Sequence, residues 1–194
     1  MLNLILFGPP GSGKGTQASK LIEKYNLLHI STGDLFRAEI GNGTALGLEA
    51  KSYMDKGELV PDSVTVNMLK SKMEQYPDIN GVIFDGFPRT IPQAEALNAM
   101  LESKGTSVTL LLSLIVDDQE IIDRIVKRGA TSGRSDDSDP VVIQNRIDTY
   151  KKQTTPVADF YGQFNKTKTV KGVGTVEDIF ESLCREIDGI LNQV

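Results

Sequence analysis

Cysteine, histidine and tryptophan are scarce in this sequence. Its 194 residues include one cysteine, one histidine and no tryptophan. A single cysteine excludes a disulfide framework within the chain, of the kind that stabilises many small secreted proteins. Cys184 lies in the apolar register of a C-terminal helical pattern, so we expect a small buried side chain and not a reactive thiol.

Long apolar segments and an excess of positive charge are also missing. No run approaches the roughly 20 apolar residues of a membrane span, and the apolar N-terminus is too short for a signal sequence. The net charge of −5 argues against non-specific binding of nucleic acid. With 39% hydrophobic residues the chain can build one full core. These features favour one cytoplasmic α/β domain that binds neither membrane nor nucleic acid.

The most informative motif that is present lies at the N-terminus. Residues 2–7 are almost wholly apolar, as in a strand covered on both faces of a parallel sheet. The next residues, Gly-Pro-Pro-Gly-Ser-Gly-Lys-Gly-Thr at 8–16, let backbone N–H groups turn inward around an anion. The amphipathic helix expected at 16–25 adds the partial positive charge of its N-terminus. Lys14 can then reach the β- and γ-phosphates of a nucleotide, unless the loop is only a glycine-rich turn with a solvated lysine.

The arginines are distributed more unevenly than the lysines. The chain has seven arginines and fourteen lysines, and six arginines lie beside glycines, turns or helices expected to face a cleft. A guanidinium binds phosphate oxygens through two parallel hydrogen bonds, so several would suit a ligand with several phosphates. Each could instead form a surface ion pair. The seven are Arg37, Arg89, Arg124, Arg128, Arg134, Arg146 and Arg185.

Apolar runs separated by helical patterns predict the fold class. Helical crossovers between consecutive strands predict a five-stranded parallel sheet with helices on both faces and right-handed connections. Ligands bind such sheets at the carboxyl ends of the strands. Three helical stretches between the second and third strands form a small insertion, and a late helix is expected to break at Thr155-Pro156. The expected strands are 2–7, 27–30, 81–85, 108–116 and 167–171.

The third expected strand ends in an acidic residue and a tight turn. Asp85 could hold Mg²⁺ directly or through its water, as expected of the companion of a phosphate loop. Gly86 allows a ligand to approach closely, and Arg89 projects from the turn. Thr90 with Gln93 also fits a helix capping box, which could explain both residues without a ligand.

Residues 129–138 form the only stretch of low hydrophobicity. We expect the preceding helix to end at Arg128, with Arg124 one turn earlier on the same face, where an anionic partner or nearby carboxylates must offset their repulsion. Composition alone would predict a flexible linker. Arg134 at the centre of the stretch, between helices that carry Arg128 and Arg146, favours a mobile lid.

Several blocks together resemble the adenylate kinases, a family of nucleoside monophosphate kinases. Gly15 separates Lys14 from Thr16 as in these enzymes, whereas signalling GTPases and most ATPases have the hydroxyl directly after the lysine. The resemblance covers the whole chain. The other matching blocks are Ser-Thr-Gly-Asp-Leu-Phe-Arg at 31–37, Leu-Val-Pro-Asp at 59–62, Asp-Gly-Phe-Pro-Arg-Thr at 85–90 with Gln93, Arg128 with Gly133-Arg134, and Arg146.

The resemblance implies reversible phosphoryl transfer, MgATP + AMP ⇌ 2 ADP, by a monomer with a P-loop NTP hydrolase-like fold. Mg²⁺ would be held by Thr16 and Asp85, directly or through water. The lid lacks the four metal-binding cysteines of some bacterial members, so we expect no structural zinc. The implied organisation is a core at 1–30, 61–126 and 138–194, an AMP-binding insertion at 31–60 and a short lid at 127–137.

The same resemblance implies a role for each site residue. The residues expected to bind ATP are Gly11, Ser12, Gly13, Lys14, Gly15, Thr16, Arg124, Arg128 and Gly174. Those expected to bind AMP are Thr32, Arg37, Glu58, Leu59, Val60, Gly86, Phe87, Pro88, Arg89, Gln93, Arg134 and Arg146. Those expected to act in catalysis are Lys14, Arg89, Arg124, Arg128, Arg134 and Arg146.

Two other functions are consistent with parts of the sequence. A UMP/CMP kinase shares most of these blocks, but the hydroxyl of Thr32 and the amide of Gln93 suit the ring nitrogens and exocyclic amine of adenine. A phosphate-loop regulator could bind nucleotide and switch partners without phosphorylating a small molecule. Six arginines and two insertions argue against that second alternative.

Overall fold

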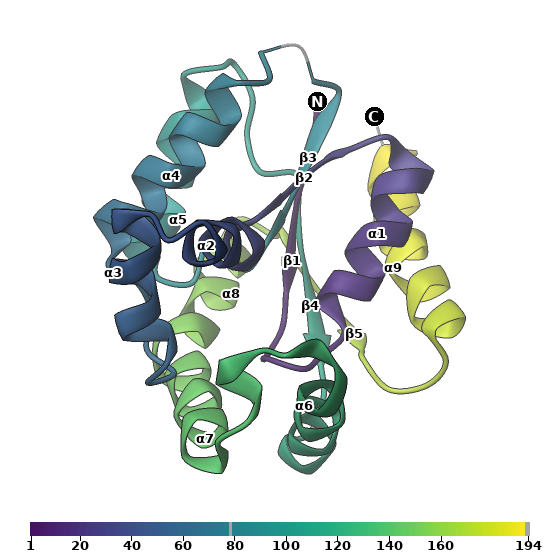
Figure 1. Cartoon of the computed structure of the whole chain (residues 1–194). Coiled ribbons are helices and arrows are strands. Elements are labelled where there is room, and N and C mark those ends of the chain that lie inside the picture. Colours follow the sequence, from purple (N-terminus) through teal and green to yellow (C-terminus); the bar gives the residue numbers. More distant parts are fainter. Residues whose placement is uncertain (78, 193–194) are drawn as a thin grey trace.

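Five parallel strands form the centre of the fold (Figure 1). They are β1 (Leu2–Phe7), β2 (Leu28–Ser31), β3 (Gly81–Asp85), β4 (Leu110–Ile115) and β5 (Thr167–Lys171). The computed structural model describes residues 1–77 and 79–192. The strand order is β2-β3-β1-β4-β5, so the loop after β1 emerges in the middle of the sheet. The parallel sheet predicted from the sequence is confirmed.

Helices cover both faces of this sheet (Figure 1). The helices of the core are α1 (Lys14–Tyr25), α4 (Asp62–Glu74), α5 (Ile91–Glu102), α8 (Thr155–Gly162) and α9 (Val176–Leu191). One face packs against α1 and α9, and the other packs against α4, α5 and α8. The remaining elements are α2 (Thr32–Gly41), α3 (Ala45–Met54), α6 (Asp118–Ser132), the 3₁₀ turn η1 (Ser135–Asp137), α7 (Pro140–Thr149) and the π turn η2 (Tyr150–Thr154).

Alternation along β1 explains why this strand is apolar at nearly every position. Leu4 and Leu6 pack toward α1 and α9, while Ile5 and Phe7 pack toward the opposite helices. None of the four side chains is more than 4% exposed. A strand in the middle of a parallel sheet has no solvated face, so hydrophobic burial fixes both of its sides.

The insertion and the base of the lid each have a small core of their own. Phe36, Ala50 and Val60 form the buried cluster of the insertion, which contains α2 and α3. A separate cluster joins α6 to α7 and includes Ile125 and Ile147. Both clusters are distinct from the cores on the two faces of the sheet. The two segments can therefore keep their own shape beside the sheet.

The helix before the lid is longer than expected. The sequence predicts an end at Arg128, but α6 continues to Ser132 and ends at Gly133, which has the left-handed φ of 65°. Gly129 lies inside this helix. A Cβ atom at this position would lie 2.7 Å from the carbonyl oxygen of Asp137. Glycine is thus required at this position for close packing and does not end the helix.

Features outside the sheet agree with the sequence predictions in part. The break expected at Thr155-Pro156 is instead a widening, because the π turn η2 joins α7 to α8 without interrupting the helical run. Thr175 and Asp178 form a capping box at the start of α9. Cys184 is buried, as predicted. Within the described part of the chain, no helix combines the length and apolar character that crossing a membrane requires.

Candidate active site

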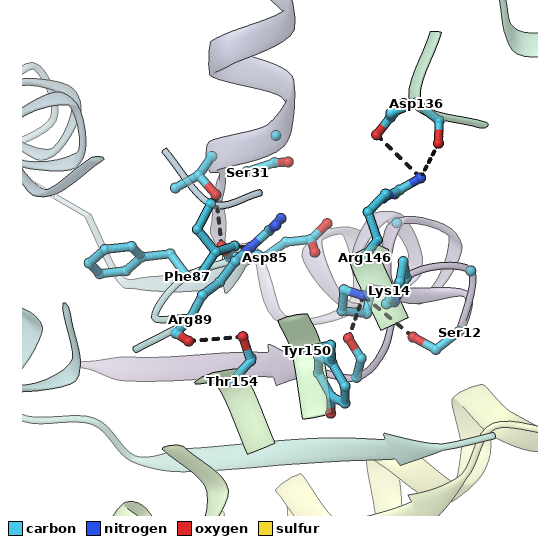
Figure 2. A pocket seen from close by; sticks show the side chains of 18 of the residues that line it. Ser12, Lys14, Ser31, Asp85, Phe87, Arg89, Asp136, Arg146, Tyr150 and Thr154 are labelled. Carbon is cyan, nitrogen blue, oxygen red and sulfur yellow. Dashed lines mark hydrogen bonds and ion pairs between the residues drawn. The ribbon is translucent and has the colours of Figure 1, made fainter. Parts of the chain in front are cut away.

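A cavity of about 470 Å³ lies where β1, β2 and β3 end (Figure 2). Its wall includes residues from the loop after β1, the insertion, the turn after β3, and the helices α6 and α7. All but one of the site residues predicted from the sequence line it. Those lining residues are Gly11, Ser12, Gly13, Lys14, Gly15, Thr16, Thr32, Arg37, Glu58, Leu59, Val60, Asp85, Gly86, Phe87, Pro88, Arg89, Gln93, Arg124, Arg128, Arg134 and Arg146.

Gly174 is the predicted site residue that does not line this cavity. It lies between β5 and α9 with φ of 123°, in a loop that Arg124 reaches. The η-nitrogen of Arg124 donates a hydrogen bond of 2.9 Å to the carbonyl oxygen of Gly172. Gly174 is therefore beside a site residue but outside the enclosed space.

The loop after β1 curls around the head of Lys14. The Nζ atom of Lys14 donates to the carbonyl oxygens of Gly8 at 2.7 Å and Pro9 at 2.9 Å, and it lies 3.5 Å from the hydroxyl oxygen of Ser12. Gly11 must be glycine, because φ is 78° and a Cβ atom would lie 2.8 Å from Ile125. This loop leads directly into the N-terminus of α1, where free N–H groups favour an anion.

The charge of Lys14 is poorly compensated. Burial lowers the pKa of Lys14 to about 7, with Arg89 and Arg146 adding to the shift and Asp85 opposing it. A neighbouring anion would restore the charged form, because opposite charges stabilise each other strongly away from water. The geometry and the charge together suit a phosphate-bearing ligand.

Asp85 stands at the end of β3, opposite Leu6 of β1 and Ser31 of β2 in the sheet register. A carboxylate oxygen lies 3.5 Å from the Nε2 atom of His29. Burial would raise the pKa of Asp85, but the contact with His29 and the charge of Lys14 together lower it. Asp85 is therefore held as a carboxylate beside the phosphate loop.

Arg89 lies in the turn between β3 and α5. Its Nε atom donates to the carbonyl oxygen of Gly86 at 2.7 Å. Burial and the nearby Arg146 lower the pKa of Arg89 to about 10, with Asp85 opposing the shift. An anionic ligand in the cavity would therefore stabilise the charged form of Arg89.

Two buried carboxylates hold the three arginines around the lid. Arg128 binds both oxygens of Asp137, at 2.6 and 2.9 Å. Arg134 binds both oxygens of Asp136 at 3.2 Å each, and Arg146 reaches Asp137 at 2.7 Å. Arg146 also lies 3.3 Å from Asp136 (Figure 2). Residues that composition marked as a flexible linker thus form an ordered ion-pair network.

Arg37 and Arg124 also have acidic partners on their own helices. Arg124 donates to Glu120 at 2.7 Å, and Arg37 donates to Asp34 at 2.5 Å. The sequence suggested that nearby carboxylates could offset the like charges of Arg124 and Arg128. Glu120 and Asp137 are these carboxylates. Both arginines still line the cavity, so the ion pairs do not remove them from it.

Thr32 and Gln93 form a polar wall on the insertion side. The Thr32 hydroxyl donates to the carbonyl oxygen of Gly86 at 2.8 Å. The side-chain oxygen of Gln93 accepts from the backbone N–H of Arg89 at 2.8 Å, and its amide nitrogen donates to Asp62 at 2.8 Å. Each side chain is 2% exposed and keeps an oxygen that can accept another hydrogen bond.

Comparison with known proteins agrees with this geometry. A family model described as adenylate kinase matches residues 6–166. The chain belongs to the adenylate kinase family. The adenylate kinase of Bacteroides fragilis is 50% identical over 188 residues, which are 97% of this chain and 99% of that protein. The adenylate kinase of Flavobacterium psychrophilum is 48% identical over 190 residues, which are 98% of this chain and all of that protein.

Membership of the adenylate kinase family makes this chain a nucleoside monophosphate kinase, a phosphotransferase. The prediction made from the phosphate loop and the arginine-bearing blocks is confirmed at this level. A relative from Bacteroides thetaiotaomicron, also an adenylate kinase, is 48% identical over 97% of this chain and 99% of its own length. None of these relatives bears a name that favours a UMP/CMP kinase or a regulator.

Some cavity residues of this family member have no clear signal in the sequence. Tyr150 and Thr154 line the cavity from the π turn η2, and the Tyr150 ring packs on Phe7 with centroids 5.5 Å apart. Only Pro156, which disturbs the helical pattern, could have indicated an irregular turn there. Asp136 lines the cavity as well and could be found only as a possible ion-pair partner of Arg134.

The carboxylate of Asp137 gives a testable pH dependence. Burial would raise its pKa, but hydrogen bonds from Arg128 and Arg146 lower it overall. Its stabilising effect is thus complete above the unfolded-state pKa of about 4 and is lost as the pH falls below that value. We expect Asp137→Asn to lower the unfolding free energy much more near neutral pH than at about pH 3. Urea titrations across this pH range measure the unfolding free energy of both proteins. A difference between them that does not change with pH would contradict the stabilising role of the Asp137 carboxylate.

Proposed function

We propose that the cavity binds ATP and AMP together and transfers the terminal phosphoryl group of ATP to AMP, giving two ADP. The observation that supports this most strongly is the convergence of Lys14 and six arginines on one cavity in a member of the adenylate kinase family. One phosphate would need few of these cations. Two nucleotides with four phosphates between them would use the whole set.

The arrangement of the wall suggests how the two nucleotides divide the cavity. The loop at 8–16 and α6 would hold the phosphates of ATP, with Arg124 toward its base. The insertion and the turn at 86–89 would hold AMP, with Thr32 and Gln93 toward adenine. Arg134 and Arg146 come from the lid and α7 and would span the phosphoryl group in transfer. Gly174 would border ATP from outside the enclosed cavity.

Mg²⁺ fits the oxygen ligands beside the phosphate loop. Thr16 and Asp85 line the cavity, and Asp85 is held as a carboxylate. Across residues 1–77 and 79–192, no three histidine, cysteine, aspartate or glutamate side chains gather at a potential metal site. Mg²⁺ is commonly held by one or two protein ligands together with phosphate oxygens and water, so these two residues would be sufficient. When bound, the ion neutralises charge on the phosphates.

The side chains of the cavity would act by alignment and by charge. Phosphoryl transfer needs no covalent intermediate with the enzyme, because charge develops on the oxygens of a loose transition state. Lys14 and the arginines are already placed around one space, where they can stabilise that charge. The acceptor is the phosphate of AMP, and water must be kept away from the reacting group.

Contacts between the insertion and the lid help to close the cavity. The hydroxyl of Ser135 donates to Asp55 at 3.1 Å. The amide of Asn145 donates to the carbonyl oxygen of Lys56 at 3.3 Å. These contacts join the residues just after α3 to η1 and α7. Such closure would favour transfer to AMP over hydrolysis.

The activity is tested by measuring ADP formed from ATP with AMP, CMP or UMP as the acceptor. We expect AMP to have the highest kcat/KM by far. A preference for UMP or CMP would make the chain a pyrimidine-specific kinase of the same class. Nucleotide binding without turnover of any acceptor would support the regulatory alternative.

Thr32→Ala tests the adenine side of the cavity. The hydroxyl hydrogen is used on Gly86, so Thr32 can only accept a further hydrogen bond, as the exocyclic amine of adenine would require. We expect KM for AMP to rise roughly three- to tenfold, and the preference for AMP over UMP to fall, since one neutral hydrogen bond is worth about 1 kcal/mol. An unchanged ratio would limit Thr32 to its structural bond with Gly86.

The proposal extends to the state and place of the enzyme. Lys14 and the six arginines that surround the cavity all belong to this chain, so a monomer would suffice for activity. A single cysteine suits a reducing compartment, and we propose action in the cytoplasm.

A further inference from the structure

The π turn η2 is the least regular helical segment near the cavity. The N–H group of Thr155 bonds to the carbonyl oxygen of Tyr150, five residues earlier. Pro156 explains the widening, because its ring would clash with the carbonyl group of Lys152 in a regular α-helix and it has no N–H to donate. Single π turns occur often at functional sites, so the side chains that this one presents are of interest.

The hydroxyl of Thr154, at the end of this turn, bonds to a residue outside its own helix. Helical threonines commonly donate to a carbonyl three or four residues earlier, as Thr65 does to Pro61 at 3.3 Å. The Thr154 hydroxyl instead donates to the backbone carbonyl oxygen of Arg89 at 2.8 Å (Figure 2). Thr154 is 4% exposed and lines the cavity. This bond joins segments 65 residues apart in the chain.

The backbone of Arg89 is therefore held on both sides by side chains. Its N–H group donates to the side-chain oxygen of Gln93 at 2.8 Å, and its carbonyl oxygen accepts from Thr154 at 2.8 Å. The Nε atom is fixed as well, on the carbonyl oxygen of Gly86 at 2.7 Å. Of these three bonds, only the one from Thr154 connects Arg89 to the helices that follow the lid.

We propose that Thr154 is a positioning residue for phosphoryl transfer, which fixes the turn of Arg89 so that its guanidinium meets the phosphate of AMP. This inference rests on the proposed role of Arg89 as an AMP ligand. Arg146 lies two helical turns before Thr154 and lines the same cavity, so the bond also fixes Arg89 relative to Arg146. Arg89 on the phosphate of AMP and Arg146 on the transferring group must hold a constant separation for acceptor and donor to stay aligned.

Thr154→Val removes the hydroxyl and leaves the Arg89 carbonyl without that donor. We expect kcat/KM for AMP to fall roughly five- to tenfold, with KM for ATP changed less than about twofold, because the ATP side does not depend on this turn. Thr154→Ser keeps a hydroxyl and should retain kcat/KM for AMP within about twofold of wild type. Steady-state kinetics with each substrate varied in turn give these values.

Thr167→Val is a matched control for the loss of a partly buried hydrogen bond from a threonine hydroxyl to a backbone carbonyl. The Thr167 hydroxyl also donates to a backbone carbonyl, that of Ala158, at 2.8 Å, but Thr167 is not among the cavity residues. We expect both valine variants to lose similar thermal stability and only Thr154→Val to lose kcat/KM for AMP. Equal kinetics in the two variants would overturn the positioning role, even if both proteins were destabilised.

Arg89→Lys and the double variant separate this inference from the proposed role of Arg89. If Arg89 binds AMP, Arg89→Lys raises KM for AMP, and adding Thr154→Val then has a smaller effect than it has alone. A clear effect of Arg89→Lys with a silent Thr154→Val overturns only the role of Thr154. An unchanged KM for AMP in Arg89→Lys overturns the proposed role of Arg89, and the inference with it. Fully additive effects would also overturn the inference, because the two residues would then act independently.

Discussion

Lys14→Met is expected to lower kcat by roughly 10²- to 10³-fold, the usual cost of removing one group that stabilises developing charge. Methionine has nearly the length of lysine but no charge, so the loop after β1 can keep its course. Burial lowers the pKa of Lys14 to about 7 in the free protein, which means that the cation is not a stabilising feature of the fold there. We therefore expect only a small change in melting temperature, because the loss of the hydrogen bonds to Gly8 and Pro9 is offset by the loss of a poorly compensated buried charge. Activity within a few-fold of wild type would reject the role of Lys14 at the phosphates.

Lys20→Met is the matched control, because Lys20 is on the same helix but outside the cavity. Its Nζ atom forms an exposed ion pair with Glu177 at 2.9 Å. Exposed pairs contribute about 0 to 1 kcal/mol, so this variant should keep both stability and kcat. A loss of activity in both variants would indicate that methionine disturbs α1, and not that Lys14 acts on phosphate.

The sheet and the phosphate loop could be predicted from the sequence because local patterns determine them. Leu4 and Ile5 face opposite layers, so a continuous apolar run was the correct signal for a strand buried on both sides. The capping residue Thr90 was likewise visible, because a cap needs only a few adjacent residues. Pro156 indicated where the late helix is irregular but not how, because η2 widens the helix there without interrupting it.

The lid could not be predicted with the same accuracy, because its order comes from contacts between distant residues. Composition marks 129–138 as a linker, since it has few apolar side chains. In the folded chain Asp136 and Asp137 bind Arg128, Arg134 and Arg146, and this network takes the place of a hydrophobic core. A one-dimensional pattern does not show that an aspartate will be buried beside three guanidinium groups.

The same limit applies to the contacts that unite the cavity. The bond from Thr154 to Arg89 depends on a turn after β3 and on a π turn that lies after the lid. Gln93 illustrates a related difficulty, because capping and ligand binding were both plausible. The side-chain oxygen of Gln93 accepts from the Arg89 N–H and not from the Thr90 N–H that a capping box requires, and the residue lines the cavity.

Arg134→Ala is expected to lower kcat by roughly two to four decades, equivalent to about 3–5 kcal/mol of transition-state stabilisation. Arg134 is bound to Asp136 through two bonds of 3.2 Å in the free protein, so its loss also breaks an ion pair. Asp136 keeps Arg146 at 3.3 Å, and therefore no uncompensated carboxylate is left behind. The melting temperature should fall only slightly. This split between a large kinetic effect and a small stability effect separates a catalytic lid from a structural ion pair.

Two further variants complete the test of Arg134. Arg134→Lys keeps the charge but loses the planar fork, so it should recover only part of kcat. Arg185→Ala removes the arginine that lies outside the cavity, where its η-nitrogen donates to Ser182 at 2.7 Å, and it should leave both kcat and stability unchanged. Near-normal kcat in Arg134→Ala would eliminate the catalytic lid. A loss of stability large enough to account for the whole kinetic effect would instead identify the contact with Asp136 as the main role of Arg134.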